Sequence, residues 1–177
     1  SLRMRIRSSE RMGWVMSSVS GLSAAHRVRA RDLAVAAALL SVRHAPAIHY
    51  TQGELRWQGI DRELKAYRGE YPNYGDCSAM ATWWLWNGLD HYGVRDVVNM
   101  QNWNWGYTGT QLRCGKRVVH KWNWRRCDLF IYGAGWPGKH VAMYIGGGKV
   151  VSHGSEAGPF ILPWNYRGDL MEVRRYI

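Results

Sequence analysis

Cysteine is scarce in this chain: Cys77, Cys114 and Cys127 are the only three in 177 residues. So few thiols exclude a scaffold built on disulfides, and an odd number leaves at least one thiol free. A bridge between Cys114 and Cys127 would need an oxidising compartment, and we expect both to be free thiols. No CxxC pair or Cys/His cluster has the spacing of zinc ligands, so we predict no metal site and no cofactor.

Long apolar runs are also missing. No stretch of about 18 apolar residues occurs, which excludes a transmembrane helix. The run Leu33–Val42 follows three arginines and precedes Ala45-Pro46-Ala47, an order similar to that of a signal peptide. Because Asp32 opens the run and Arg43 closes it well inside the chain, we interpret it as a buried helix. The protein is then expected to be made in a cytoplasm without a signal peptide, or to be exported by other means.

Acidic residues are few relative to basic ones. The chain has 13 Asp and Glu against 24 Lys and Arg, which gives a formal charge of +11. Such a charge favours polyanionic partners, namely nucleic acid, an anionic membrane or an acidic bacterial wall, without choosing among them. With 46% hydrophobic residues, including 11 Trp and 10 Tyr, the chain is not a disordered polyelectrolyte. Its length suits one domain with a sizeable core.

Helical patterns precede strand patterns along the chain. We expect a basic N-terminal extension over residues 1–28, partly helical around Met12–Ala25, followed by one domain over residues 29–177. This order predicts the α+β class, with the helices packed on an antiparallel sheet. The expected helices are Arg31–Arg43, Gly59–Tyr67 and Asp76–Trp86, the last ending near Asn87-Gly88; residues 99–126 are expected to be irregular; and the expected strands are Cys127–Tyr132, His140–Ile145, Lys149–His153 and Met171–Ile177.

Cys77 is the first candidate catalytic residue. It opens a helix that is apolar nearly all round, where free backbone N–H groups and the helix dipole favour a thiolate and lower the thiol pKa. The same N–H groups can bind the oxyanion of a tetrahedral intermediate. Asp76 is a plausible N-cap that can also tune the site, and Ser78 follows the thiol. The competing interpretation is an inert core cysteine.

His140 is the second candidate, at the mouth of an apolar strand. Gly146–Gly148 joins this strand to the next as a hairpin. If Gly147 and Gly148 are the turn residues, position 142 pairs with 153, and His153 lies diagonal to His140. A shift by one residue places Ser152 there instead. A Cys nucleophile, a His base and a polar orienting residue form the triad of nucleophilic acyl transfer, in papain-like order.

These segments resemble the NlpC-type cell-wall cysteine peptidases, and more closely the peptidase domain of endolysins from phages of actinobacteria. The resemblance covers roughly residues 30–177. It departs from the family at Cys127, where a Gly is usual, and at His153, which comes one residue late for the third catalytic position. The segments that carry it are Asp76-Cys77-Ser78, Cys127–Tyr132, His140–Gly146, Gly148–Glu156, Gln101-Asn102-Trp103, Gly106–Thr110 and Val173–Ile177.

The resemblance implies a papain-like α+β fold that hydrolyses an amide of the peptidoglycan stem peptide. It also implies an upstream tyrosine at the oxyanion site. Tyr50 is our candidate, and Tyr67, Tyr71 and Tyr74 are rivals; the long spacing from Tyr50 to Cys77 implies an insertion at about 54–70. In this scheme Cys77 attacks, His140 is the base, and His153 or Ser152 orients it.

Substrate contacts are expected from the aromatic loop, through Trp103, Trp105 and Tyr107, and from Glu156, with Arg167 as a further candidate. The expected partner is peptidoglycan, together with acidic wall polymers. We expect no nucleic acid partner and a monomer.

The function expected is that of a wall endopeptidase of the phage endolysin kind, made in the host cytoplasm and acting on the wall. The alternatives are an N-acetylmuramoyl-L-alanine amidase or an acyltransferase on the same fold, and a non-enzymatic basic module that binds wall polymer or nucleic acid.

Overall fold

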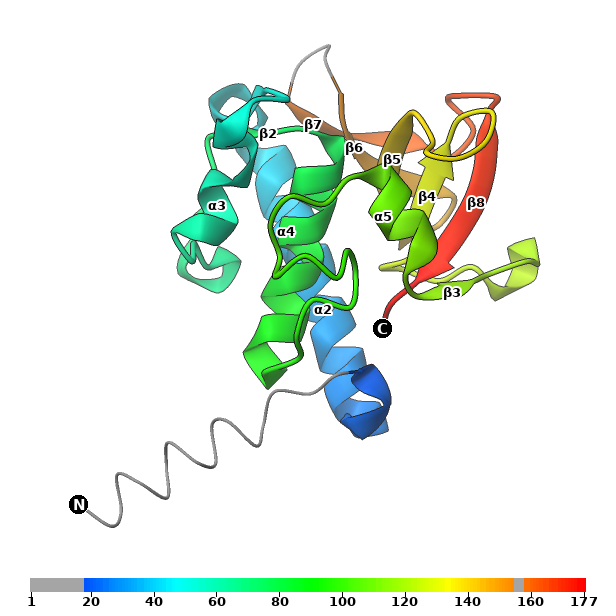
Figure 1. Cartoon of the computed structure of the whole chain (residues 1–177), viewed down its shortest axis with the longest axis horizontal. Coiled ribbons are helices and arrows are strands. Elements are labelled where there is room, and N and C mark those ends of the chain that lie inside the picture. Colours follow the sequence, from blue (N-terminus) through cyan, green and yellow to red (C-terminus); the bar gives the residue numbers. More distant parts are fainter. Residues whose placement is uncertain (1–17, 155–157) are drawn as a thin grey trace.

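The computed structural model describes residues 18–154 and 158–177. Helices come first and strands second, and the helices pack on an antiparallel sheet (Figure 1), so the predicted α+β class is confirmed. The helices are α2 (Ala24–Arg43), α3 (Gln58–Asp61), α4 (Cys77–Leu89) and α5 (Thr108–Arg113). The strands are β1 (His49–Tyr50), β2 (Tyr74–Gly75), β3 (Lys116–Arg117), β4 (Leu129–Tyr132), β5 (His140–Gly146), β6 (Lys149–His153), β7 (Pro159–Pro163) and β8 (Leu170–Arg175).

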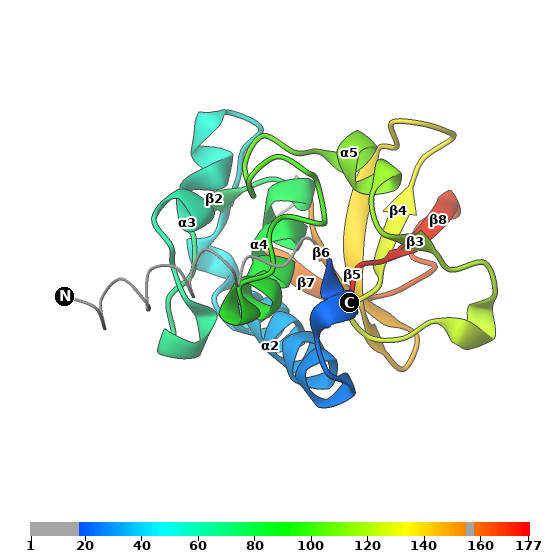
Figure 2. The same cartoon turned by 60° about the horizontal axis from the view of Figure 1, so that its bottom comes forward.

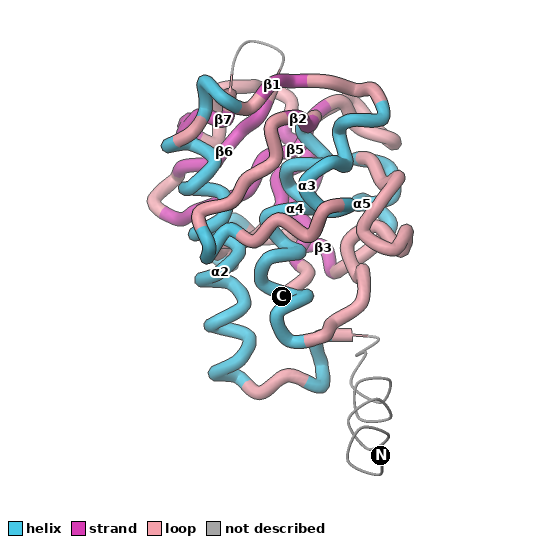
Figure 3. The backbone as a smooth tube through the Cα atoms, turned by 90° about the vertical axis from the view of Figure 1, so that its left-hand side faces the viewer, coloured by secondary structure: helices cyan, strands magenta, loops and turns pink. Residues whose placement is uncertain are grey.

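Helix α2 begins at Ala24, seven residues before the expected start at Arg31. The reason is local: the side chain of Ser23 accepts the backbone N–H of His26 and caps the helix. Alanines form the buried stripe, which lets α2 pack closely along α4 (Figures 2 and 3). The run that resembles a signal peptide is thus part of a core helix, as predicted. Of the stretch Met12–Ala25 that was expected to be partly helical, residues 12–17 lie outside the described residues. Val19–Gly21 forms a 3-10 turn, and α2 begins at Ala24.

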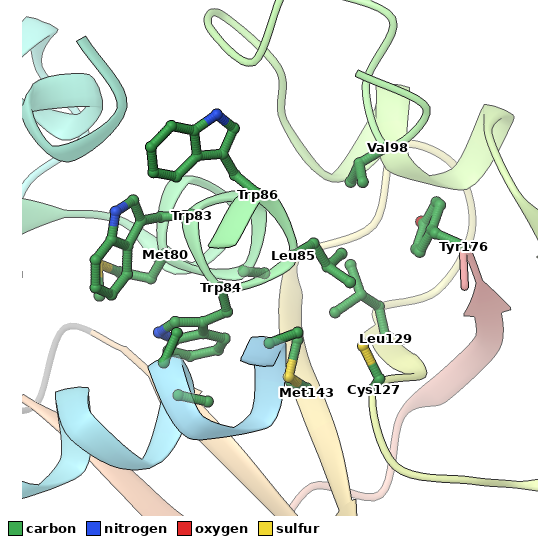
Figure 4. Packing of buried hydrophobic residues seen from close by; sticks show 14 of the residues in the cluster. Met80, Trp83, Trp84, Leu85, Trp86, Val98, Cys127, Leu129, Met143 and Tyr176 are labelled. Atoms are coloured by element: carbon green, nitrogen blue, oxygen red, sulfur yellow. The ribbon is translucent and has the colours of Figure 1, made fainter. Parts of the chain in front are cut away.

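Helix α4 is buried along its whole length, with its side chains surrounded by the core (Figure 4). The expected end at Asn87-Gly88 is wrong, because α4 continues to Leu89 and a 3-10 turn carries the chain to Gly93. Gly88 serves packing instead: a Cβ there would lie 2.2 Å from the carbonyl oxygen of Ala30 in α2. One turn earlier on the same side, Trp84 inserts toward α2 and donates its indole N–H to Ser41 at 2.9 Å.

Six strands of the described chain form one sheet in the order β3-β8-β4-β5-β6-β7, and all neighbours are antiparallel. Strand β7, which begins at Pro159 and ends at Pro163, is not among the expected strands. It pairs with β6 at the sheet edge, where a proline costs little because its missing N–H faces outward. The irregular region expected over 99–126 contains α5, β3 and a 3-10 turn at Lys121–Asn123.

The sheet has an apolar cluster on each face. One face packs on α4 and includes Val141, Met143 and Val151. The other carries Phe130 and Tyr132. Among the described residues, no helix has the length and apolarity needed to cross a membrane.

Candidate active site

Cys77 is the first residue of α4, and the chain reaches it through the short parallel pair β1–β2, in which Tyr50 pairs with Gly75. Asp76 caps the helix as predicted, since its Oδ1 accepts the backbone N–H of Ala79 at 2.8 Å and the hydroxyl of Ser78 at 3.1 Å. The cap fixes where the thiol projects from the first helical turn. Cys77 is itself buried.

The thiol of Cys77 is not a preformed thiolate. Burial and the neighbouring Asp76 carboxylate raise its pKa to about 11, against the opposing effect of the backbone N–H groups of Val141 and Ser78. The expectation of a lowered thiol pKa is therefore wrong, because desolvation outweighs the helix terminus. The hydrogen bond from Val141, the residue after His140, places the start of β5 against the sulfur.

His140 is buried, and its Nε2 lies 2.7 Å from Ser152 Oγ. Ser152 Oγ in turn lies 3.1 Å from the hydroxyl of Tyr166. Burial and then the nearby Arg167 guanidinium lower the pKa of His140 to about 4, despite the Asp169 carboxylate, which raises it. At neutral pH His140 is thus an uncharged imidazole that is able to accept a proton.

The hairpin register decides between His153 and Ser152. Gly146 pairs with Lys149 as expected, but Tyr144 pairs with Val150, so β5 carries one extra residue and Ala142 pairs with Ser152. The register that pairs position 142 with His153 is therefore wrong. Of the two alternatives, the structure brings Ser152 to His140.

His153 has a different partner on the other face of β6. Its Nε2 lies 3.0 Å from the carbonyl oxygen of Gly75, two residues before Cys77. Because a carbonyl only accepts, Nε2 carries the proton. His153 therefore anchors the strand that leads into the nucleophile.

Tyr50 lies close to the nucleophile. Burial and then the proximity of Cys77 raise the pKa of its phenol, and the hydroxyl accepts a hydrogen bond from Gln52 at 3.2 Å. The rival tyrosines have other surroundings: Tyr67 is 63% exposed, Tyr71 stacks on His44, and Tyr74 lies beside His49.

Arg56 is a site residue that sequence reasoning missed. Its Nε lies 3.0 Å from Asp76 Oδ2, an ionic contact in which the N–H is not aimed at the oxygen. A second guanidinium nitrogen, Nη2, donates to Ser78 Oγ at 2.8 Å and to the Gly106 carbonyl at 2.7 Å. The guanidinium thus contacts Asp76 and Ser78, the residues on both sides of Cys77, and connects them to the aromatic loop through Gly106. Nothing in the sequence around Arg56 signals this role.

The aromatic loop is held in a strained shape. Met100, Asn102, Trp103 and Trp105 all have positive φ, between 52° and 68°. The Asp96 carboxylate stabilises this shape by accepting four backbone N–H groups, among them that of Trp103.

The predicted substrate residues have different surroundings. Trp103 is buried in the core, whereas Trp105 is 68% exposed and Tyr107 is exposed with its ring edge-on to Trp136. Glu156 lies outside the described residues. Arg167 forms a two-bond ion pair with Asp169.

The three cysteines, all within the described ranges, are free thiols. In the described part of the chain no group of three His, Cys, Asp or Glu side chains is placed to hold a metal ion. The groups gathered at the site are a thiol, an imidazole and the hydroxyl and amide groups around them.

Comparison with known proteins identifies the fold. No protein-family model and no curated protein matches the sequence. Among solved structures, the peptidoglycan hydrolase RipB of Mycobacterium tuberculosis has a TM-score of 0.59 at 21% identity, with 90% of this chain and 70% of RipB covered. The P60 domain of an antigen of Mycobacterium avium subspecies paratuberculosis has a TM-score of 0.51 at 19% identity, over 84% of this chain and 95% of that one.

NlpC1 of Trichomonas vaginalis has a TM-score of 0.55 at 18% identity over 82% of this chain. The present chain spans 44% of the length of NlpC1, less than half. At these identities the likeness establishes the architecture: the chain has the papain-like fold of the NlpC/P60 domains, as the resemblance in sequence implied.

Proposed function

We propose that this protein is a peptidoglycan hydrolase that cleaves an amide bond of the stem peptide with Cys77 as nucleophile and His140 as base. The observation that carries the proposal is the contact between α4 and β5. Cys77, buried at the capped N-terminus of α4, accepts a hydrogen bond from the backbone of Val141 in β5. The residue before Val141 is His140, which lies in hydrogen-bond contact with Ser152. The NlpC/P60-type fold, which RipB shares, supports the wall as the source of the substrate.

The first step follows from the protonation states. Because Ser152 engages Nε2 of His140, Nδ1 is the nitrogen left to receive the thiol proton. With the thiol pKa near 11 and the imidazole pKa near 4, the resting pair is neutral. Proton transfer then accompanies attack of the sulfur on the carbonyl carbon, and no ion pair needs to form beforehand.

The oxyanion forms beside the start of α4. The Cys77 backbone N–H at the first helical turn is the proposed first donor, and the Tyr50 hydroxyl is the proposed second donor. Gln52 donates to the oxygen of that hydroxyl, so its hydrogen is free to point at the substrate.

Collapse of the intermediate uses the same imidazole. Once protonated, His140 is a strong acid because burial and Arg167 disfavour its charged form, so it readily gives its proton to the leaving amine. The C–N bond breaks and leaves a thioester on Cys77. His140 then removes a proton from water, which attacks the thioester and frees the thiol.

The finer assignment is an endopeptidase of the endolysin kind, made in the cytoplasm of a host and released onto its wall. The excess of positive charge suits this role because wall polymers are acidic.

Mass spectrometry of purified actinobacterial peptidoglycan tests the assignment. The wild type is expected to release stem-peptide fragments cut at one internal amide, and Cys77→Ser protein is expected to release none. Fragments cut between the sugar and the first alanine would identify an amidase instead. Wall binding with no cleavage by either protein would identify a binding module.

A further inference from the structure

A second candidate site is a basic cavity of about 320 Å³ on a different part of the molecule. Four cationic side chains line it, and they come from separate segments: Arg27 from α2, Lys116 from β3, Arg125 from the loop before β4, and Arg175 from β8. We call these four residues the basic pocket. Val19, Val97, Tyr176 and Ile177 add apolar walls.

Strand register places the basic pocket away from the nucleophile. His140 pairs with Tyr132, the last residue of β4. Lys116 pairs with Arg175 at the end of β8. Arg174, the residue before it, pairs with Leu129, which is the first residue of β4, so Arg175 lies beyond that end of β4. The two sites therefore lie at opposite ends of the strands, separated by about 10 Å or more along the sheet.

Positive charge in the basic pocket is only partly neutralised. The buried Asp128 carboxylate holds Arg175 through two hydrogen bonds of 2.7 and 2.8 Å. Burial, Arg175 and Arg31 together lower the pKa of Arg125, which marks a site crowded with like charge. Neither Arg27 nor Lys116 forms an ion pair with a residue in the ranges 18–154 or 158–177. A bound anion would relieve this crowding.

An exposed aromatic segment adjoins the basic pocket. Residues 118–124, here called the aromatic finger, protrude beyond the sheet between β3 and β4, in yellow-green at the right of Figure 1 and of Figure 2. Trp122 is 79% exposed and Val119 is 70% exposed. Arg175 joins the two features, because it lines the pocket and also donates to the Asn123 carbonyl in the finger.

The finger presents a flat ring. His120 stacks on Trp122 with 7° between the planes, so one indole face is covered and the other is open. Lys121 is folded back over the Trp164 ring, away from this open face. An open indole face on a segment that adjoins the basic pocket matches the apolar face of a sugar ring that carries acidic groups. A membrane-inserting tip would expose a cluster of apolar side chains, whereas the ring next to Trp122 is a polar imidazole.

We propose that the basic pocket and the aromatic finger bind an acidic polysaccharide, with its anionic groups in the pocket and a sugar ring on Trp122. Its source in the bacterial wall rests on the proposed function, whereas the recognition chemistry does not. Such a site would hold the enzyme on an insoluble wall while leaving the distant nucleophile free to act.

Titration calorimetry on the Cys77→Ala full chain tests this proposal without interference from hydrolysis. The probes are oligogalacturonate, inorganic polyphosphate of equal charge, and phosphatidylglycerol vesicles. Arg27→Gln/Lys116→Gln protein is expected to bind oligogalacturonate about tenfold more weakly at low salt, with a shallower salt dependence. Trp122→Ala is expected to weaken oligogalacturonate about fivefold and to leave polyphosphate unchanged. Arg68→Gln, an exposed cation on another surface, is the matched control and is expected to change nothing.

Two results would overturn the proposal. Equal binding of all probes by wild-type and Trp122→Ala protein would reduce the site to charge alone. Trp122-dependent binding of vesicles with no binding of oligogalacturonate would make the finger a membrane contact. Failure of the proposed hydrolysis is detected by a separate assay. Wild-type protein would then leave the stem peptide of purified peptidoglycan uncut, whether or not the Cys77→Ala protein binds oligogalacturonate.

Discussion

His140 Nε2 and Ser152 Oγ lie 2.7 Å apart, so a neutral hydroxyl is the group that positions the candidate catalytic base. The hydroxyl holds the ring in place without adding negative charge. A neutral partner does not stabilise the charged imidazolium as a carboxylate would. The burial of His140 and the nearby Arg167 therefore lower the imidazole pKa to about 4. The same contact extends to Tyr166, so the base sits at the end of a hydroxyl chain rather than of an ionic one.

Ser152→Ala is expected to lower kcat/KM about a hundredfold, because the imidazole loses the contact that holds its ring in place. Ser152→Asp is expected to keep the contact and raise the pKa of His140, which moves the acid limb of the pH–rate profile upward. Steady-state kinetics on a soluble stem peptide between pH 4 and 8 measure both effects. Ser20→Ala, an exposed serine, is the control. An unchanged profile in both Ser152 variants would remove Ser152 from the site.

The thiol of Cys77 is expected to be slow to alkylate at neutral pH. Its pKa of about 11 leaves a small thiolate fraction, so the iodoacetamide rate should still be rising at pH 9. Asp76→Asn keeps a capping oxygen and removes the carboxylate charge, so alkylation should become faster at pH 7. Peptide mass spectrometry separates Cys77 from Cys114 and Cys127. A midpoint below pH 8 in the wild type would show that the helix terminus outweighs burial after all.

Arg56→Gln is expected to lower kcat/KM about tenfold, because Asp76, Ser78 and Gly106 lose their common anchor. It should also destabilise the fold by about 2 kcal/mol, since it leaves the largely buried Asp76 carboxylate without its ionic partner. Arg68→Gln removes an exposed arginine and provides the control. Activity and urea unfolding measured together test the role. Loss of stability with full activity in the remaining folded protein would make Arg56 purely structural.

Acid should weaken the fold through His140. Its folded pKa lies below the unfolded value of 6.5, so the unfolded chain binds a proton first as the pH falls. Stability from this group is present above pH 6.5 and is lost between about pH 6.5 and 4, by up to about 3 kcal/mol. His140→Asn should show a correspondingly smaller loss over that window in urea unfolding. Parallel curves for the two proteins would contradict the low pKa.

Local sequence signals predicted much of this structure. Asp76 before an apolar run gave the capped helix, and Gly146–Gly148 gave the β5–β6 turn. The signals that failed depend on tertiary contacts. Gly88 looks like a helix end in sequence, but it is the point where α4 meets α2. The extra residue in β5, which brings Ser152 to His140, has no signature of its own among strand residues. The prolines in β7 are compatible with a strand only at a sheet edge. The edge position of β7 cannot be known before the strand order is known.

The candidate residues could be named from the sequence, but their electrostatics could not. Residue type and order identified Cys77 and His140 as candidates, and the family resemblance added Tyr50. The direction of the thiol pKa depends on how completely α4 and β5 bury the sulfur, and the pairing of Arg56 with Asp76 depends on a distant segment folding over the cap.

The most direct test of the account is the rate of amino-group release from purified peptidoglycan by wild-type, Cys77→Ala, His140→Ala and doubly substituted protein. Each single substitution is predicted to lower the rate at least about a thousandfold, and the double variant is predicted to be no slower, because the two residues act as one unit. Wild-type rates in the Cys77→Ala protein would contradict the central claim.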